Sequence, residues 1–140
     1  MGRRLIDVEA DIGFEVWAPD LNSLFEEAAL AMYEIMVDVE RVDPSMEREV
    51  ELKSDDLSLL LHSWLSELLY ITDVEGLVFS KFEATVKRDD RGAELRGKAW
   101  GEPVDPVKHN PKTEVKAVTY YKLRVERKGD YWRAVVVLDL

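Results

Sequence analysis

A chain of 140 residues with 46% apolar and 34% charged side chains has the size and composition of one soluble globular domain. Its formal net charge of −10 disfavours direct contact with nucleic acid, which requires a basic surface, and favours cations or basic protein surfaces as partners. No apolar run approaches the roughly 20 residues that span a bilayer, and the start lacks the apolar segment of a secretion signal. We therefore expect a cytoplasmic protein that does not enter a membrane.

The residue inventory restricts the chemistry further. There is no cysteine, which excludes disulfides, thiolate zinc sites and a thiol nucleophile. The only histidines are His62 and His109, so a three-histidine catalytic zinc site is excluded as well. The glycines are too few and too scattered for a nucleotide-binding loop, a dinucleotide fingerprint or a serine elbow. Any metal ion would therefore be bound mainly by oxygen atoms.

The N-terminal part predicts two short strands followed by a helix. Residues 5–10 and residues 13–17 each alternate with a period of two, which is typical of strands. Pro19 interrupts the second run, and Asp20 can cap a helix because its short side chain accepts from free amides of the first turn. Apolar residues then recur every three or four positions, which predicts a helix over residues 20–38.

The most apolar helix is expected over residues 54–76, after a turn at residues 42–45 and a strand at residues 48–52. Ser54 or Asp55 can cap its start, and Gly76 can end it in a left-handed conformation. Its leucines and Trp64 occupy so much of its circumference that a broad surface, such as a curved sheet, must cover it.

The C-terminal half is dominated by strands. Residues 78–88 and 94–102 predict a hairpin around the turn at 89–92, and the three prolines within residues 103–111 predict an irregular loop. Residues 113–127 favour a strand, although Val115 and Val118 also fit a helical turn. After a turn at 128–130, the almost continuously apolar residues 131–138 predict a buried strand. This order predicts an α+β fold: a single two-layer domain, residues 1–140, with a mixed β-sheet packed against two main helices.

Acidic residues near both ends of the chain are candidates for cation binding. Asp7, Glu9 and Asp11 would share one face if the first strand continued, and a hard cation such as calcium or magnesium would relieve their repulsion. Asp139 and the terminal carboxylate of Leu140 form a second acidic pair directly after the buried strand. The alternatives are a solvated strand face for the first group and a simple exit from the core for the second.

Two further parts of the chain carry polar side chains that could bind a ligand or a partner. Glu102, Asp105 and His109 lie on or beside the proline-stiffened loop, where binding groups are often found, although Asp before Pro is also ordinary turn chemistry. Lys116 could project a cation from a strand or could simply be solvated. His62 falls with serines away from the main apolar face of its helix, which favours a structural role over metal binding.

Several of these stretches together resemble the archease family, small activators of the RNA-splicing ligase that joins RNA ends through a guanylylated histidine. The matching pieces run in order along nearly the whole chain. They are residues 10–13 (Ala-Asp-Ile-Gly), residues 21–36 followed by Asp38, residues 60–70, Gly101 and Glu102, Asp105, His109, residues 113–120 (Thr-Glu-Val-Lys-Ala-Val-Thr-Tyr) and residues 138–140 (Leu-Asp-Leu). One position departs from the family: Val8-Glu9 stands where the family usually has His-Thr before the Ala-Asp pair, so any role of that histidine is absent here or belongs to Glu9.

The resemblance implies a binding site and a function. It implies that Asp11, Asp139 and Leu140, the last through a main-chain or terminal oxygen, hold a divalent cation, calcium before Mg²⁺ or Mn²⁺. It implies that Lys116 takes part in activation, and it makes Asp38, Glu102, Asp105, His109 and Glu9 candidates for contact with the partner. The protein would then be no enzyme itself, but would accelerate guanylylation and multiple turnover of the ligase catalytic subunit in tRNA splicing.

Two other functions stay open on the residues alone. A metal-dependent phosphoester hydrolase would use the same carboxylates with His109 as general base, and it would turn over substrate without a partner. A chaperone-like or small-ligand-binding module would use an exposed apolar face, and its binding would not depend on a divalent cation.

Overall fold

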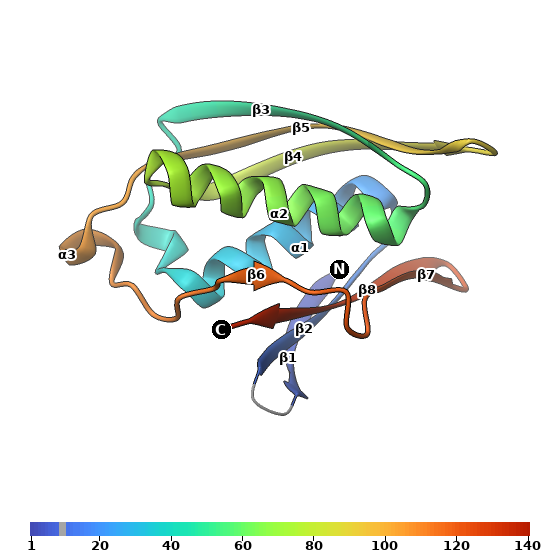
Figure 1. The fold of residues 1–140 in the computed structure, drawn as a ribbon, viewed down its shortest axis with the longest axis horizontal. Helices are drawn as coiled ribbons and strands as arrows, with labels where there is room; N and C mark the ends of the chain where they lie inside the picture. The colour runs from blue at the N-terminus through green and yellow to red at the C-terminus, as the bar shows by residue number, and fades with distance from the viewer. Residues whose placement is uncertain (9–10) are drawn as a thin grey trace.

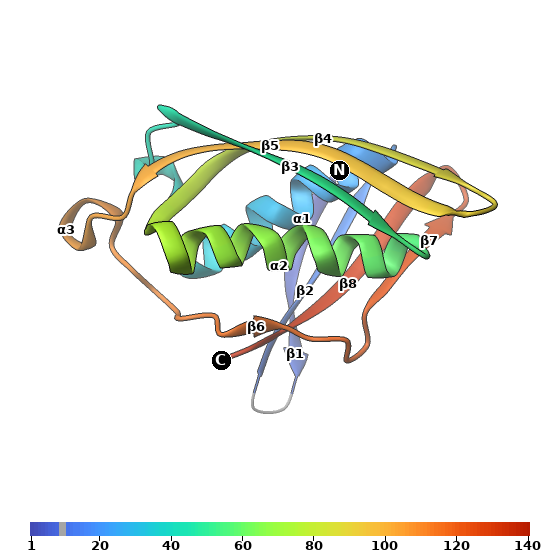
Figure 2. The ribbon, with the colours of Figure 1, turned by 45° about the horizontal axis from the view of Figure 1, so that its top comes forward.

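The structure, a computed structural model that describes residues 1–8 and 11–140, places two long helices between two antiparallel sheets (Figures 1 and 2). Sheet A has the strand order β1-β2-β8-β6, with β7 also paired to β8, and sheet B has the order β3-β5-β4. The strands of sheet A are β1 Gly2–Val8, β2 Asp11–Ala18, β6 Ala117–Val118, β7 Arg124–Lys128 and β8 Tyr131–Asp139. Those of sheet B are β3 Met46–Ser54, β4 Leu77–Asp89 and β5 Gly92–Pro103.

Local sequence signals set the limits of the helices. Helix α1 (Leu21–Met36) begins where the Asp20 side chain accepts from the Ser23 N–H at 2.8 Å. Helix α2 (Leu57–Glu75) begins in the same way at Asp56, one residue beyond the two predicted caps, and ends at Gly76 with φ 70°. A single 3₁₀ turn, η1 (Val39–Arg41), follows α1, and a one-turn helix, α3 (Pro106–His109), forms within the predicted loop. None of the helices in the described part of the chain has the length and apolar character needed to cross a membrane.

The core lies where the helices meet both sheets. Helix α1 packs on β4 and β2, and α2 packs on β3 and β5 on one side and on β6 and β7 on the other. Trp64 is fully buried and donates its Nε1–H to the Phe25 carbonyl at 3.0 Å. It fits against β5 because Gly97 has no side chain: a Cβ there would lie 2.7 Å from the Trp64 ring. The predicted broad cover over α2 is therefore present, divided between two sheets.

The α+β class is confirmed, but the predicted single mixed sheet is replaced by two antiparallel ones. Strands β3 and β4, which flank α2 in the sequence, belong to one sheet, yet β5 lies between them and pairs antiparallel with both. The tight β4–β5 hairpin places β5 there, so no parallel pair forms. Because sheet A covers the opposite side of the helices, there are more layers than the two predicted (Figure 1).

Two strand predictions also change. The predicted strand over residues 113–127 is two short strands, β6 and β7, separated by a turn in which Lys122 has φ 55°. Near the start, β1 ends at Val8 and pairs antiparallel with β2, so Asp7 lies opposite Ile12 and on a different strand from Asp11. The prediction that both aspartates share one strand face is therefore wrong, and Glu9 lies outside the described residues.

Candidate metal and partner site

Asp11 and Asp139, remote in sequence, lie at the same end of sheet A. The register between β2 and β8 includes Ile12 opposite Leu138, and both of these side chains pack in the core. The next positions outward are Asp11 and Asp139. Since side chains alternate along a strand, both aspartates belong to the outer face, where directly opposite residues have Cβ atoms about 4.5–5.5 Å apart.

Gly13 allows the side chains of β1 to pack closely over β2 near Asp11. Gly13 is buried beneath β1, and a Cβ there would lie 2.8 Å from Cγ1 of Ile6 and 2.9 Å from Cγ2 of Val8. Because Gly13 has no side chain, the side chains of Ile6 and Val8 can pack directly over β2. The absence of a side chain at Gly13 thus permits the close packing of β1 on β2, the strand that carries Asp11.

Strand β6 brings Lys116 to the same place. The Lys116 N–H donates to the Asp139 carbonyl at 2.8 Å, and Ala117 pairs with Asp139. Lys116 is exposed, while Leu140 is half-buried and packs against the core beside this end of the sheet. We call Asp11, Asp139, Leu140 and Lys116 the carboxylate edge. The structure therefore gathers the three residues predicted to bind metal and the lysine predicted to act in activation.

The chemistry of this donor set fits a hard divalent cation. Carboxylates directly opposite each other on a sheet repel, and a cation bound between them removes that penalty. Asp11 is half-buried and Asp139 is exposed, so water reaches the edge. Among the side chains that the structure describes, which do not include those of Asp7 and Glu9, no three acidic or histidine groups gather closely enough to form a complete metal cluster. The two aspartates would thus hold an ion with several coordination positions left for water, main-chain oxygen or a partner.

The other predicted contact residues form a separate network around α3. One oxygen of Glu102, Oε2, accepts from Lys108 Nζ at 2.8 Å, from His109 Nε2 at 2.9 Å and from the Asp43 N–H at 2.7 Å. The ammonium of Lys108, with the Asp43 amide and His109, lowers the pKa of the Glu102 carboxyl to about 2. We call Asp43, Glu102, Asp105, Lys108 and His109 the α3 network.

His109 is fully buried in this network, and both of its ring nitrogens are engaged. Nδ1 accepts from the Asp105 N–H at 2.9 Å, which leaves the ring proton on Nε2, where it is donated to Glu102. Asp105 also caps α3 through its side chain, accepting from the Val107 N–H at 3.0 Å. With no free nitrogen and no access to solvent, His109 is poorly placed to be the general base of a hydrolase.

Asp38 attaches the α3 network to the end of α1. Its N–H donates to the His109 carbonyl at 2.9 Å, and its carboxylate lies 3.6 Å from Lys112 Nζ and 3.7 Å from Arg41 Nε. Both ribbon views show α3 at one end of the molecule, apart from the C-terminus (Figures 1 and 2). The predicted contact residues therefore fall into two groups, only one of which contains the carboxylate edge.

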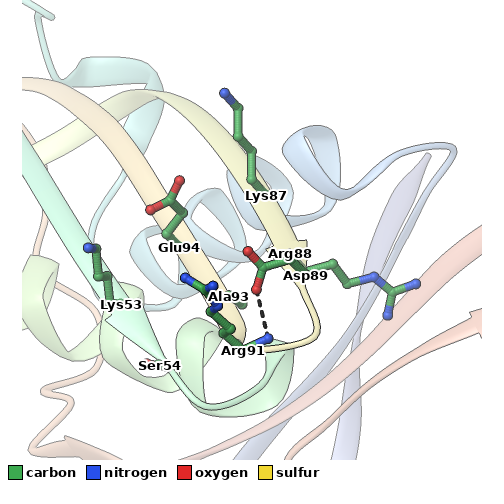
Figure 3. A pocket seen from close by; sticks show the side chains of 9 residues that line it. Lys53, Ser54, Lys87, Arg88, Asp89, Arg91, Ala93 and Glu94 are labelled. Carbon is green, nitrogen blue, oxygen red and sulfur yellow. Dashed lines mark hydrogen bonds between the residues drawn. The ribbon is translucent and has the colours of Figure 1, made fainter.

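A charged hollow of about 430 Å³ beside the β4–β5 turn was not predicted (Figure 3). Lys53, Lys87, Arg88 and Arg91 line it together with Asp89 and Glu94. Figure 3 shows Lys87 and Arg88 pointing in different directions, and Asp89 Oδ1 accepts from the Arg91 N–H at 2.8 Å. Because its cations diverge and alternate with acids, this hollow offers no convergent set of groups for one ligand.

Fold and site together define a small α+β protein whose acidic groups meet where the start of its second strand, β2, lies beside the end of its last strand, β8. The sequence profile of the Archease protein family matches residues 4–140. The chain therefore belongs to the archease family.

Individual relatives agree with this assignment. The chain is 44% identical over 132 residues to the archease of Pyrococcus furiosus, covering 94% of this chain and 93% of that protein. It is 42% identical over 139 residues to the archease of Methanothermobacter thermautotrophicus, covering 99% of each.

Two solved structures share the fold. The solution structure of Methanobacterium thermoautotrophicum protein 1598 superimposes with a TM-score of 0.88 at 42% identity, covering 99% of both chains. The crystal structure of a Thermotoga maritima archease, described as a possible chaperone, gives a TM-score of 0.66 at 23% identity, covering 100% of this chain and 98% of that one. The second likeness shows the fold alone.

Proposed function

We propose that this archease is a divalent-cation-dependent activator of the RNA-splicing ligase, promoting guanylylation and multiple turnover of the catalytic subunit in tRNA splicing. The observation that carries the proposal is the meeting of Asp11 and Asp139 on neighbouring strands, with the Lys116 backbone bonded to Asp139. Membership of the archease family adds the expectation of the partner. The protein would supply binding groups and no catalytic residue of its own.

Asp11, Asp139 and an oxygen of Leu140 would hold the cation, with calcium expected first and Mg²⁺ or Mn²⁺ as substitutes. When bound, the cation offsets negative charge on a nucleotide triphosphate, which is the main electrostatic obstacle to nucleotidyl transfer. The residues of the chain position this charge. Asp11 and Asp139 present their carboxylates at the end of sheet A, and Lys116, directly before the adjacent strand β6, provides a cationic side chain beside the bound ion.

The incomplete donor set supports an activator over a closed structural metal site. Two side-chain ligands leave coordination positions free, so oxygens of the ligase or its nucleotide could complete the shell. A closed site would need more protein donors than the described residues gather here. The engaged ring of His109 argues against the alternative of an independent phosphoester hydrolase.

The test is guanylylation of the purified ligase with GTP, measured with and without this protein and with and without a chelator. Asp139→Ala should abolish the stimulation, while Glu51→Ala, which removes an exposed carboxylate from sheet B, should retain it. Thermal unfolding of both variants checks the fold. Full stimulation by a folded Asp139→Ala variant would refute the mechanism.

A chaperone-like module is the second candidate, because one structural relative is described as a possible chaperone. That function predicts binding to the ligase, or to another protein, that a chelator does not change. A pull-down in the presence and absence of chelator separates it from the activator.

A further inference from the structure

The outer face of sheet A, the face opposite the helices, changes character along its length. At one end are Asp11 and Asp139 of the carboxylate edge. Val8 pairs with Asp11 at this end and, with Ile6 on the next level, lies over Gly13, beside the buried Val137. At the far end is a hollow of about 800 Å³ lined by charged and aromatic side chains, which we call the basic hollow: Arg4, Glu15, Trp17, Arg124, Glu126, Lys128, Tyr131 and Arg133.

The ion pairs of the basic hollow leave positive charge in excess. Arg133 joins its two carboxylates, with Nη2 2.7 Å from Glu15 and Nη1 3.0 Å from Glu126. Arg4 lies 3.2 Å from Glu15, and Lys128 and Arg124 lie 3.5 and 3.9 Å from Glu126. Four cationic side chains therefore share two carboxylates, an excess of two positive charges in a chain of net charge −10.

The outer cations of this network can accept another anion. Arg4 and Arg124 have side chains 66% and 60% exposed, so each keeps donors that Glu15 and Glu126 do not use. Arg133 is mostly covered, and its guanidinium beside Glu15 lowers the pKa of that carboxyl. The floor of the hollow is thus a fixed ion pair, and the rim is cationic.

We propose that the basic hollow docks an acidic segment on the surface of a protein partner, and that the partner lies along β2 and β8 with this segment at one end and the carboxylate edge at the other. The inference rests on the proposed function for the identity of that partner, the ligase. Asp11 and Glu15 are four residues apart on β2, so the partner's acidic segment lies about 13 Å from the groups that meet the cation. The two ends of this face bind different groups, a cation at one and an acidic segment at the other, so only one orientation of docking satisfies both.

Three observations favour an acidic protein segment over RNA. Glu15 and Glu126 lie among the cations and would repel a continuous row of phosphates. The net charge of −10 opposes the long phosphate backbone of an RNA more than a short acidic segment that is confined to the basic hollow. The Trp17 ring is packed against Gly2, where a Cβ would lie 2.5 Å from Cζ2, so this aromatic ring is partly covered against base stacking.

The experiment compares the native chain with a double charge reversal on the rim, Arg4→Glu with Arg124→Glu. The control is Arg96→Glu with Lys87→Glu, which makes the same change in net charge on exposed positions of sheet B. Labelled oligoglutamate peptide and labelled oligouridine RNA are the probes at low salt, each followed by fluorescence anisotropy. We expect the peptide to bind the native chain and the control, and the rim variant to weaken that binding by about tenfold.

Peptide binding that the rim variant leaves unchanged, or no binding by the native chain, would overturn the proposal. So would RNA that binds more tightly than the peptide and depends on the same two arginines. With the ligase, the rim variant should raise the concentration of protein needed for half-maximal stimulation while the maximal stimulation stays the same. If the native chain fails to stimulate the ligase yet binds the peptide through Arg4 and Arg124, the proposed function fails and the docking site stands.

Discussion

The carboxylate edge and the α3 network both contain acidic side chains and a lysine, but these groups are bonded to one another only in the α3 network. In the α3 network, Glu102 accepts three hydrogen bonds and His109 uses both ring nitrogens, so every charge meets a partner within the chain. At the carboxylate edge, Asp11 and Asp139 stand on adjacent strand ends with no third acidic or histidine side chain gathered among the described residues.

The difference separates groups that hold the fold from groups that are available for binding. Glu102 and His109 gain stability from their mutual contacts, and a ligand would have to break those contacts to reach them. Two opposed carboxylates instead cost stability, and a cation bound between them would remove that cost. We therefore expect changes in the α3 network to alter stability and changes at the carboxylate edge to alter binding.

The largest expected effect is the loss of calcium binding when Asp11→Asn is combined with Asp139→Asn. Removing both charges eliminates the side-chain basis for holding Ca²⁺, so the native chain should bind the ion in calorimetry and the double variant should not. At a calcium concentration ten times the Kd, binding should add about 1.4 kcal/mol to the native chain's free energy of unfolding. Calcium binding that persists in the double variant would place the site elsewhere.

His109→Ala should instead lower stability and leave calcium binding almost unchanged. It leaves the Asp105 N–H and Glu102 without a buried partner and should lower the free energy of unfolding by about 1–3 kcal/mol, measured by urea denaturation. Calcium affinity should stay within about twofold of the native value. His62→Ala is the matched control: His62 is half-buried and bonds the Val118 carbonyl at 2.8 Å, so its loss should cost less. Loss of calcium binding in His109→Ala would mean that the two regions are coupled.

Gly13→Ala tests whether the packing of β1 on β2 supports the carboxylate edge. The new Cβ would meet Ile6 and Val8, and the overpacking should cost about 1–3 kcal/mol of unfolding free energy. Calcium binding should weaken as well, because the strand pair next to Asp11 must shift. Adding Val8→Ala should restore part of both losses, and failure to do so would exclude this contact as the cause.

The smallest expected effect is a pH dependence of stability that comes from Glu102 in the α3 network. The pKa of Glu102 is about 2 in the folded chain and near 4.5 when unfolded, so its contribution is fully present above pH 4.5 and is lost as the pH falls toward 2. Glu102→Gln should therefore reduce the decline of stability across this window, measured by urea denaturation at several pH values. An unchanged decline would assign it to other carboxylates.

Periodicity and capping located both long helices from the sequence. Asp20 and Gly76 act as predicted, and the almost continuously apolar run of residues 131–138 identified a strand that is buried over most of its length. These features depend on neighbours in the sequence, where side-chain spacing and backbone preference decide the outcome. The sequence could not show that β5 lies between β3 and β4, because strand order depends on contacts between distant segments.

The sequence by itself determined which atoms could bind a ligand: oxygen-rich side chains, no thiol, and acidic residues at both ends of the chain. Only the tertiary structure decided which of them meet. The register of β2 on β8 brings Asp11 to Asp139, the pairing of β1 with β2 puts Asp7 and Asp11 on different strands, and burial engages His109 within the fold. A cation or a partner recognises groups that are close in space, and closeness across 128 residues of sequence is set by strand pairing and core packing, which no local pattern contains.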